Sequence, residues 1–528
     1  MTEILNYAAT CMILLSGFTA AEVHADGRPT TEQGAARTRH TAAQKYIDIK
    51  MKEEPFRSGL VGVLAVTAGG DTLAEYGSMR KLIPASNTKL ISTGLAFRGL
   101  GGDFRFTTRL GYCGHVRDGV LHGDLYILGG GDPTIASGDR MAATADSLFA
   151  RWTRALKLAG IRKIDGHVVG DGRFFDGPVE NDTWAYSDLG TDYGTGGNGL
   201  CFNRNIQTVE VSPATSINGR VNAGNSCPST PWIFFRNTAT TSGAGKGDNL
   251  CLANTDLAPV AELRGTLSMD KGQKKEAFSN KFGALTCAWQ FSEALKKSGI
   301  PVSHGPADID SFGNIRHTEA WEKGNAVPGF RYGKKAAEQD SLTVIGAFKS
   351  PSLKEIAKVT NSRSDNFYAE TLIRMLTKAR TGSASYDSCR VVIGREMDSL
   401  GVDMSCGAQI KDGSGLSRHD YISPDFFCRY LKAMSSSGIF RQWLYTVGTA
   451  GEGTMASRLK GQNESLKHRI RMKSGSMNGV LCYSGYVMPE AGQPDGDMVI
   501  FSIMTNNCPD GGAKVRSFVD RLLLRLAE

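Results

Sequence analysis

Residues 82–90 read LIPASNTKL, and the apolar run ISTGLAFRGL follows at 91–100. A polar residue ahead of an apolar run that reaches a glycine predicts a helix beginning near Ser86 and ending near Gly99. Residues three apart share one face of a helix, so the Lys89 amine is expected beside the Ser86 hydroxyl. A serine becomes an effective nucleophile when a neighbouring base takes its proton, and a lysine of lowered pKa can be that base. Ser-x-x-Lys is common by chance, so its weight depends on other motifs.

A second motif, Ser364-Asp365-Asn366, leads directly into a helical pattern that begins near Phe367. All three residues favour the N-cap position, so a structural cap explains the motif by itself. The functional interpretation gives Ser364 a proton-relay hydroxyl and Asn366 an amide that binds a substrate carbonyl.

A third motif, Lys473-Ser474-Gly475-Ser476, ends the strand-like segment HRIRMKSGS just before the hairpin-turn signal Asn478-Gly479. A lysine and a hydroxyl on an edge strand can bind a substrate carboxylate, and a glycine lets a peptide backbone approach closely. The alternative is a polar turn without function.

In the order Ser-x-x-Lys, Ser-x-Asn, Lys-Ser-Gly, the motifs match the signature of β-lactamases and penicillin-binding proteins. The chain resembles the penicillin-binding D-alanyl-D-alanine carboxypeptidases/endopeptidases, serine DD-peptidases of the low-molecular-mass class C type, from about residue 40 to residue 526. The resemblance implies an α/β (α+β) fold. It combines a β-lactamase/transpeptidase-like catalytic domain, in which helices flank an antiparallel sheet, with inserted β-rich accessory domains. Besides 82–90, the segments that carry it are 128–134 (LGGGDPT), 169–175 (VGDGRFF), 188–203 (DLGTDYGTGGNGLCFN), 412–417 (DGSGLS) and 473–486 (KSGSMNGVLCYSGY).

The resemblance implies roles for the first two motifs. Ser86 attacks the carbonyl of the penultimate D-alanine and forms an acyl-enzyme, with Lys89 as general base. Ser364 relays a proton to the leaving amine, and Asn366 orders Lys89 and the substrate amide. Water then hydrolyses the ester.

In the third motif, the resemblance gives Lys473 the role of supplying positive potential and Ser474 that of binding the terminal carboxylate. Gly475 belongs to the same substrate-binding edge, and the backbone N–H groups of Ser476 and of the nucleophile form the oxyanion hole. The family usually has threonine where Ser474 stands, so altered affinity is expected rather than lost activity. Asp171 is given a substrate-binding role because its segment lies near the active site in relatives. No cofactor and no metal is implied.

The chain has 528 residues, enough for three or four domains at roughly 150 residues each. The first two motifs are far apart, which predicts a split catalytic domain at 40–105 and 341–528 with one or two accessory domains, more plausibly two, at 106–340. Strand-like runs separated by Gly, Asn and Asp make that insert β-rich. Predicted strands outside it are 60–66, 72–77, 480–488 and 498–505, and predicted helices are 353–360, 367–380 and 513–527.

Composition narrows the classes of function. Hydrophobic residues make up 41% and charged residues 22%, which excludes a disordered chain. The net charge of +8 is mild and no dense Lys/Arg block occurs, so nucleic acid is a poor candidate partner.

The basic amphipathic helix predicted at 513–527 fits either a membrane surface or the cover of the last sheet, and the second is favoured. No strong membrane anchor is expected.

The apolar run at 8–21 has the length of a signal-peptide core, which predicts a signal peptide at 1–25 and a periplasmic protein with at most loose membrane association. Glu3 and the lack of Lys or Arg before the run keep a buried helix or a misassigned start open as alternatives, and lipidation of Cys11 is disfavoured. Cleavage would leave ten cysteines, a number that fits disulfides such as Cys482–Cys508, whereas free core thiols are the alternative.

The predicted function is cleavage of D-alanyl-D-alanine or of cross-links in peptidoglycan stem peptides, with β-lactam antibiotics as covalent ligands. One alternative is a β-lactamase or esterase of the Ser-x-x-Lys superfamily, against which the long insert argues. The other is a non-catalytic penicillin-recognising or cell-wall-binding protein, against which the complete set of motif residues argues. The sequence leaves the balance of carboxypeptidase and endopeptidase activity open, along with the oligomeric state.

Overall fold

The computed structural model describes residues 41–309, 342–405, 407–490, 498–509 and 511–528. The predicted signal peptide, Cys11 and Cys406 lie outside these residues, as does most of the polar stretch at 306–340. No helix in the described part combines the length and apolar character needed to cross a membrane.

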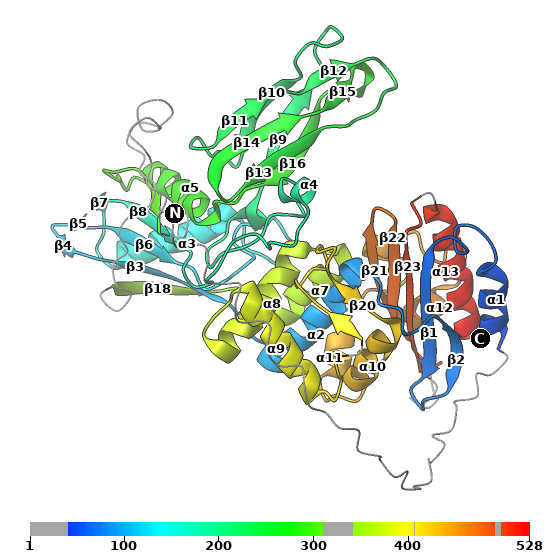
Figure 1. Ribbon diagram of the computed structural model, residues 1–528. Helices are drawn as coiled ribbons and strands as arrows, with labels where there is room; N and C mark the ends of the chain where they lie inside the picture. The colour runs from blue at the N-terminus through cyan, green and yellow to red at the C-terminus, as the bar shows by residue number, and fades with distance from the viewer. Residues whose placement is uncertain (1–40, 310–341, 406, 491–497, 510) are drawn as a thin grey trace, which may run out of the picture. The chain divides into compact units, whose positions relative to one another are not determined.

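Strands from both ends of the chain form one antiparallel five-stranded sheet (Figure 1). The hairpin predicted near the N-terminus and the two strands predicted near the C-terminus are confirmed, and the Asn478-Gly479 turn joins the last hairpin as expected. The order is β2 (Thr72–Tyr76), β1 (Leu60–Thr67), β23 (Val499–Asn506), β22 (Val480–Val487) and β21 (Ile470–Met477).

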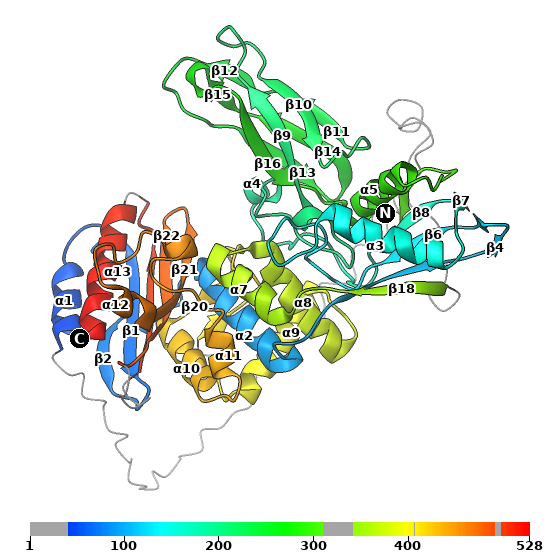
Figure 2. The ribbon, with the colours of Figure 1, turned by 180° about the vertical axis from the view of Figure 1, so that it is seen from behind.

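Both faces of this sheet are covered, which explains why all of β23 is buried. Alternate residues of a strand point to opposite faces. Val499, Phe501 and Ile503 pack in a cluster with α13 (Gly512–Ala527), whereas Ile500 and Met504 pack in a cluster with α10 (Pro424–Ser435). Figures 1 and 2 show α1 (Ala42–Lys50) beside α13 on the outer face. The C-terminal helix therefore covers the last sheet, as favoured from the sequence; its buried residues are Val515, Phe518, Val519, Leu522, Leu523 and Leu526.

A group of helices beside the sheet carries the motif residues. The helix α2 (Thr88–Leu100) packs against α7 (Leu353–Arg363) and α8 (Asn366–Thr381), confirming the helices predicted from the sequence. The remaining elements of this part are α9 (Tyr386–Ser399), α11 (Phe440–Leu444), α12 (Glu464–Arg469) and the short pair β19 (Ala408–Gln409) and β20 (Tyr421–Ile422).

The first part of the insert has its own sheet and its own core. Helices α3 (Ala145–Leu158) and α5 (Gly283–Lys297) bury their apolar faces against each other and the sheet. The sheet order is β17 (Ala307–Asp308), β8 (Val168–Asp171), β6 (Leu125–Leu128), β3 (Thr107–Tyr112) and β18 (Thr343–Lys349), and β4 (His115–Arg117), β5 (Val120–His122) and β7 (Lys163–Asp165) form a smaller sheet.

The second part of the insert is built from short strands around a separate apolar cluster that contains Val209, Ala261 and Phe278. Its sheets are β10 (Asn222–Cys227), β9 (Ile206–Ser212) and β16 (Lys274–Ser279); β11 (Phe234–Asn237), β14 (Ala258–Arg264) and β13 (Cys251–Thr255); and β12 (Thr240–Ser242) with β15 (Thr266–Ser268). The two separate clusters are consistent with two accessory domains.

One boundary of the predicted domains needs moving. The strand β18 pairs antiparallel with β3, so it belongs to the insert and not to the C-terminal piece beginning at 341. Its register with β3 runs to the pair Lys349–Thr107. We propose that the insert ends near residue 349, with the division into domains otherwise as predicted.

The cysteines of the described residues are free. Cys482 directs its thiol to the carbonyl of Ile83 at 3.4 Å, and Cys508 directs its thiol to the carbonyl of Asn506 at 3.4 Å. The bridge considered between Cys482 and Cys508 is therefore wrong, because the two thiols contact different carbonyls. Six of the described cysteines are buried in apolar clusters, the pattern expected of free core thiols: Cys201, Cys287, Cys389, Cys428, Cys482 and Cys508.

Candidate active site

Ser86 lies in a 3-10 turn (Ala85–Asn87) that runs directly into α2, so the helical spacing of the first motif is kept. The Lys89 Nζ donates to the Ser86 Oγ at 2.8 Å. Residue Ala85 has a φ of 45°, a left-handed conformation that costs energy for a non-glycine residue and is typical of functional sites. The predicted pairing of the Ser86 hydroxyl with the Lys89 amine is therefore present.

Lys89 is completely buried and is held by three acceptors. Besides Ser86, its Nζ donates to the Asn366 Oδ1 at 2.6 Å and to the Ser414 carbonyl at 2.7 Å. Burial lowers the pKa of Lys89 to about 8, although the nearby Asp412 and other carboxylates oppose this shift. A lysine with this pKa is neutral in a useful fraction of molecules near neutral pH and can accept a proton from the serine.

The Ser364-Asp365-Asn366 motif is both a helix cap and part of the site. The Asp365 side chain caps α8 by accepting from the Tyr368 N–H, so the structural interpretation holds for Asp365. Ser364 takes a left-handed conformation with a φ of 60°, and Asn366 begins α8 with its amide oxygen on Lys89. The two interpretations thus apply to different residues of one motif.

The third motif lies on β21, the edge strand of the five-stranded sheet. The buried Lys473 Nζ donates to the Ser364 Oγ at 2.9 Å and to the Ser474 carbonyl at 2.6 Å, which joins the second motif to the third. Burial, with the charge of Lys89 as the second cause, holds the pKa of Lys473 well below its usual range. The Ser474 hydroxyl lies 3.3 Å from that of Thr454.

Two glycines allow the backbone to close around Ser86. A Cβ on Gly475 would lie 2.4 Å from the Pro84 carbonyl oxygen and 3.0 Å from the Ser86 nitrogen, so only glycine lets β21 approach the nucleophile turn this closely. Gly415 has a φ of 77°, and a Cβ there would lie 1.9 Å from the Ala85 carbonyl oxygen. The sequence predicts that Gly475 lets a peptide substrate approach the strand. In the structure, the backbone that approaches Gly475 is that of the turn around Ser86.

A cavity of about 520 Å³ opens over Ser86. Its walls combine motif residues with residues of the insert and of the segment after Asp412. Arg418 is exposed there, and the exposed Tyr193 donates its hydroxyl to the Asp188 carboxylate at 3.2 Å. The lining residues are Ser86, Ser187, Asp188, Tyr193, Ser364, Asn366, Gly415, Leu416, Arg418, Ser476, Met477 and Asn478.

A group of buried acids around Lys89 was not predicted as part of the site. The Glu370 carboxylate accepts from the backbone N–H groups of Gly413 and Ser414, which fixes the carbonyl that holds Lys89. Burial, with the nearby Asp412 second, raises the pKa of Glu370 to about 8. Glu370 shares one face of α8 with Phe367 and Ile373, and a carboxylate on such an apolar face is the signal that could have revealed it.

Asp171, the remaining predicted site residue, does not line this cavity. It is buried in β8, and its carboxylate accepts from the Arg173 guanidinium at 2.8 and 3.0 Å and from the Arg173 backbone N–H at 3.0 Å. The structure brings the other eight predicted residues to one place and leaves Asp171 in the insert, where it orders the turn that follows β8. Across the described residues, no group of three or more His, Cys, Asp or Glu side chains is arranged to hold a metal ion.

Comparison with known proteins gives a consistent result. The model of the D-Ala-D-Ala carboxypeptidase 3 (S13) family matches residues 43–307 and 320–526. The D-alanyl-D-alanine carboxypeptidase of Actinomadura sp. (strain R39) is 27% identical over 513 residues, which cover 94% of this chain and 86% of that protein. The penicillin-sensitive carboxypeptidase A of Dictyostelium discoideum is 23% identical over 491 residues, which cover 89% and 87%.

Among solved structures, penicillin binding protein 4 (dacB) of Haemophilus influenzae matches with a TM-score of 0.75 at 20% identity, over 92% of this chain and 99% of that one. This likeness confirms the predicted fold class.

Proposed function

The chain belongs to the D-Ala-D-Ala carboxypeptidase 3 (S13) family and is a serine DD-peptidase, and on that premise we propose that Ser86 forms an acyl-enzyme with the penultimate D-alanine of a peptidoglycan stem peptide. The observation that carries the proposal is the Lys89 Nζ at 2.8 Å from the Ser86 Oγ in the cavity wall. Release of a terminal D-alanine is carboxypeptidase activity, and the same chemistry on a peptide cross-link is endopeptidase activity.

In the acylation step, neutral Lys89 accepts the Ser86 proton while the Oγ attacks the D-alanyl carbonyl. The new C–O bond gives a tetrahedral oxyanion, which the backbone N–H groups of Ser86 and Ser476 stabilise. The C–N bond to the terminal D-alanine then breaks, and the proton that Lys89 took from Ser86 reaches the leaving amine through the Ser364 hydroxyl, which gives one proton and takes up another. Neutral Lys89 then accepts a proton from the water that attacks the ester, and it returns that proton to the Ser86 Oγ as the ester C–O bond breaks.

Lys473 and Ser474 bind the terminal carboxylate of the substrate. Burial, with the charge of Lys89 as the second cause, lowers the pKa of Lys473 and so disfavours its charged form. A bound carboxylate favours the charged form of Lys473, so substrate binding itself supplies the positive potential. The hydroxyl of Ser474 lies on the same strand, with its oxygen near Thr454.

The same site accounts for the proposed ligands and location. A β-lactam presents a strained amide and a carboxylate to the same groups, and the names of two matching proteins mention penicillin. The signal peptide predicted at 1–25 and a peptidoglycan substrate favour the periplasm. No cofactor takes part in these steps.

The test is to label the purified protein with a fluorescent penicillin, measure its intact mass and map the modified peptide. We expect a long-lived adduct on the peptide that contains Ser86, together with D-alanine release from a pentapeptide. Rapid turnover of the drug would instead identify a β-lactamase. If the protein forms no adduct and releases no D-alanine, the non-catalytic alternative remains. Purified muropeptides with free and cross-linked stems then separate carboxypeptidase from endopeptidase activity.

Replacing Lys473 with alanine should lower the acylation rate constant by on the order of 10²-fold, because a positive group aimed at the substrate is lost. The fold should persist, since Lys473 forms no ion pair among the described residues and donates only to Ser364 and to the neighbouring Ser474 carbonyl. Stopped-flow labelling gives the rate, and thermal melting checks the fold. Unchanged D-alanine release from a pentapeptide would refute the role of Lys473.

A further inference from the structure

A short segment of the insert, residues 186–196, forms part of the wall of the catalytic cavity, and we call it the strap. It begins with the short helix α4 (Tyr186–Leu189) and supplies Ser187, Asp188 and Tyr193 to the cavity lining. The Tyr193 carbonyl accepts from the Asn366 Nδ2 at 2.9 Å. Because the Asn366 Oδ1 accepts from Lys89, the strap also contacts the side chain that orients the general base.

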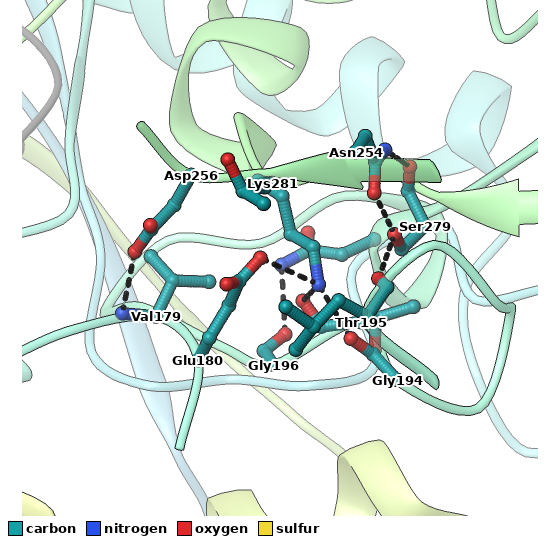
Figure 3. A network of polar contacts seen from close by, with 12 residues as sticks. Val179, Glu180, Gly194, Thr195, Gly196, Asn254, Asp256, Ser279 and Lys281 are labelled. Carbon is teal, nitrogen blue, oxygen red and sulfur yellow. Dashed lines mark hydrogen bonds and ion pairs between the residues drawn. The ribbon is translucent and has the colours of Figure 1, made fainter. Parts of the chain in front are cut away.

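Lys281 lies behind the strap, in the turn between β16 and α5, and its side chain is fully buried. Its Nζ donates to the Gly194 carbonyl at 2.5 Å and to the Thr195 carbonyl at 3.4 Å, and it forms an ion pair with Glu180 at 3.1 Å. Figure 3 shows the amine between the Glu180 carboxylate and the carbonyls of the strap. Burying an ammonium group costs free energy unless carbonyls and carboxylates surround it. The Glu180 carboxylate and the strap carbonyls supply these partners for Lys281.

Other contacts hold the strap from the same side. The Ser279 Oγ donates to the Leu189 carbonyl at 2.6 Å, and the Ser279 N–H donates to the Gly190 carbonyl at 3.1 Å. Asn254 exchanges hydrogen bonds with Ser279 (Figure 3). Within this set Lys281 is the charged donor, and charge-assisted hydrogen bonds are stronger than neutral ones.

We propose that Lys281 is a positioning residue for the peptidase reaction: by fixing the Gly194 and Thr195 carbonyls it holds the strap, and through the Tyr193 carbonyl it orders Asn366 against Lys89. Lys281 does not touch the cavity and takes no part in proton transfer. The inference deepens the proposed function and rests on it.

The test compares Lys281→Met, which keeps most of the side-chain volume, with the wild type. Labelled penicillin counts the intact active sites, so kinetics are expressed per site and any loss of folded protein is removed. We expect kcat/KM for a D-Ala-D-Ala pentapeptide to fall on the order of 10- to 100-fold per site, since a displacement of about 1 Å in a catalytic group costs that much. Hydrogen exchange should become faster in the strap and stay unchanged in β22 and α13, neither of which contributes a residue to the strap or to its contact with Asn366.

Glu180→Gln is the matched control, because it removes the ion pair but leaves the two Lys281–carbonyl bonds. Its kcat/KM should stay within about threefold of the wild type, as expected for a change that preserves the strap bonds. The double variant Lys281→Met/Glu180→Gln avoids an unpaired buried carboxylate and should behave like Lys281→Met. A purely structural role would lower the number of active sites without changing the kinetics per site.

Wild-type kinetics per site together with unchanged exchange in the strap would overturn the proposal. If Lys281→Met yields no folded protein, Ser279→Ala decides in its place: faster exchange in the strap with lower kcat/KM supports the proposal, and no change in either refutes it. A wild-type protein that neither binds penicillin nor releases D-alanine would refute the proposed function, while the exchange comparison would still decide whether Lys281 holds the strap.

Discussion

Replacing Ser86 with alanine should abolish both the penicillin adduct and D-alanine release, with a fall in activity of at least about 10⁴-fold. The change removes the nucleophile and a single hydrogen bond, the one that the Ser86 Oγ accepts from Lys89. Lys89 keeps its bonds to the Asn366 side chain and the Ser414 carbonyl, so its position should not change. Intact-mass measurement after incubation with labelled penicillin reads out the adduct, and a coupled assay reads out D-alanine.

The control for this variant is a second serine in the same cavity. Ser187 lines the cavity from the strap and lies outside the Ser-x-x-Lys motif, so Ser187→Ala should retain a full adduct. Thermal melting should show the wild-type transition for both variants, because neither hydroxyl is needed for the core. A persistent adduct in Ser86→Ala, or its loss in Ser187→Ala, would place the nucleophile elsewhere.

The parts of the site that depend on local geometry were predictable from the sequence. Ser86 and Lys89 are three residues apart, a spacing that places them on one face of a helix. The residues Asn478-Gly479 favour the turn between β21 and β22. In both cases neighbouring residues determine the local geometry. The order of the three motifs then related distant segments: Asn366 lines the same cavity as the nucleophile, and Lys473 donates to Ser364 of the second motif. The order of the motifs predicted that these segments meet because it identifies a known fold. It does not by itself show which residues are in contact.

The parts that depend on contacts between distant segments were not predictable. Nothing near Tyr193 in the sequence indicates that its carbonyl would meet Asn366, since a backbone acceptor has no residue signature. The partner of a strand is equally unspecified by its own pattern, so the pairing of β18 with β3 across the predicted boundary at 341 could not be foreseen. The substrate role of Asp171 stays a prediction: Asp171 does not line the cavity, and a resemblance between segments does not say which side chain faces it.

The bridge considered between Cys482 and Cys508 also depended on the distance between segments that the sequence does not give. An even number of cysteines is compatible with bridges, but a bridge needs two Cβ atoms within a few ångströms of each other. Cys482 lies within the sheet on β22, and Cys508 follows the end of β23. Counting residues cannot supply that geometry, whereas the alternative of buried thiols in apolar clusters needs only the hydrophobic pattern.

Replacing Lys89 with methionine should slow acylation by on the order of 10³-fold, the range expected for the loss of a general base. The variant also removes the ammonium that faces the buried carboxylates Glu370 and Asp412. Removing one member of such a charged group leaves the others uncompensated, so the free energy of unfolding should fall as well. Chemical denaturation measures that loss separately from stopped-flow acylation.

The pH profile of acylation distinguishes a base from a structural cation. Only neutral Lys89 can accept the Ser86 proton, and the neutral fraction grows as pH rises through its pKa of about 8. The wild-type rate constant should therefore increase close to tenfold per pH unit well below that pKa and level off above it.

Lys89→Arg is the matched variant because it keeps the positive charge but cannot lose its proton in this range. Its acylation should be slow and independent of pH between about 6 and 9, with stability nearer to that of the wild type than Lys89→Met shows. A Lys89→Arg enzyme that retained the rising profile would mean that another group titrates, and Glu370, whose pKa of about 8 lies in the same range, would be the next residue to replace.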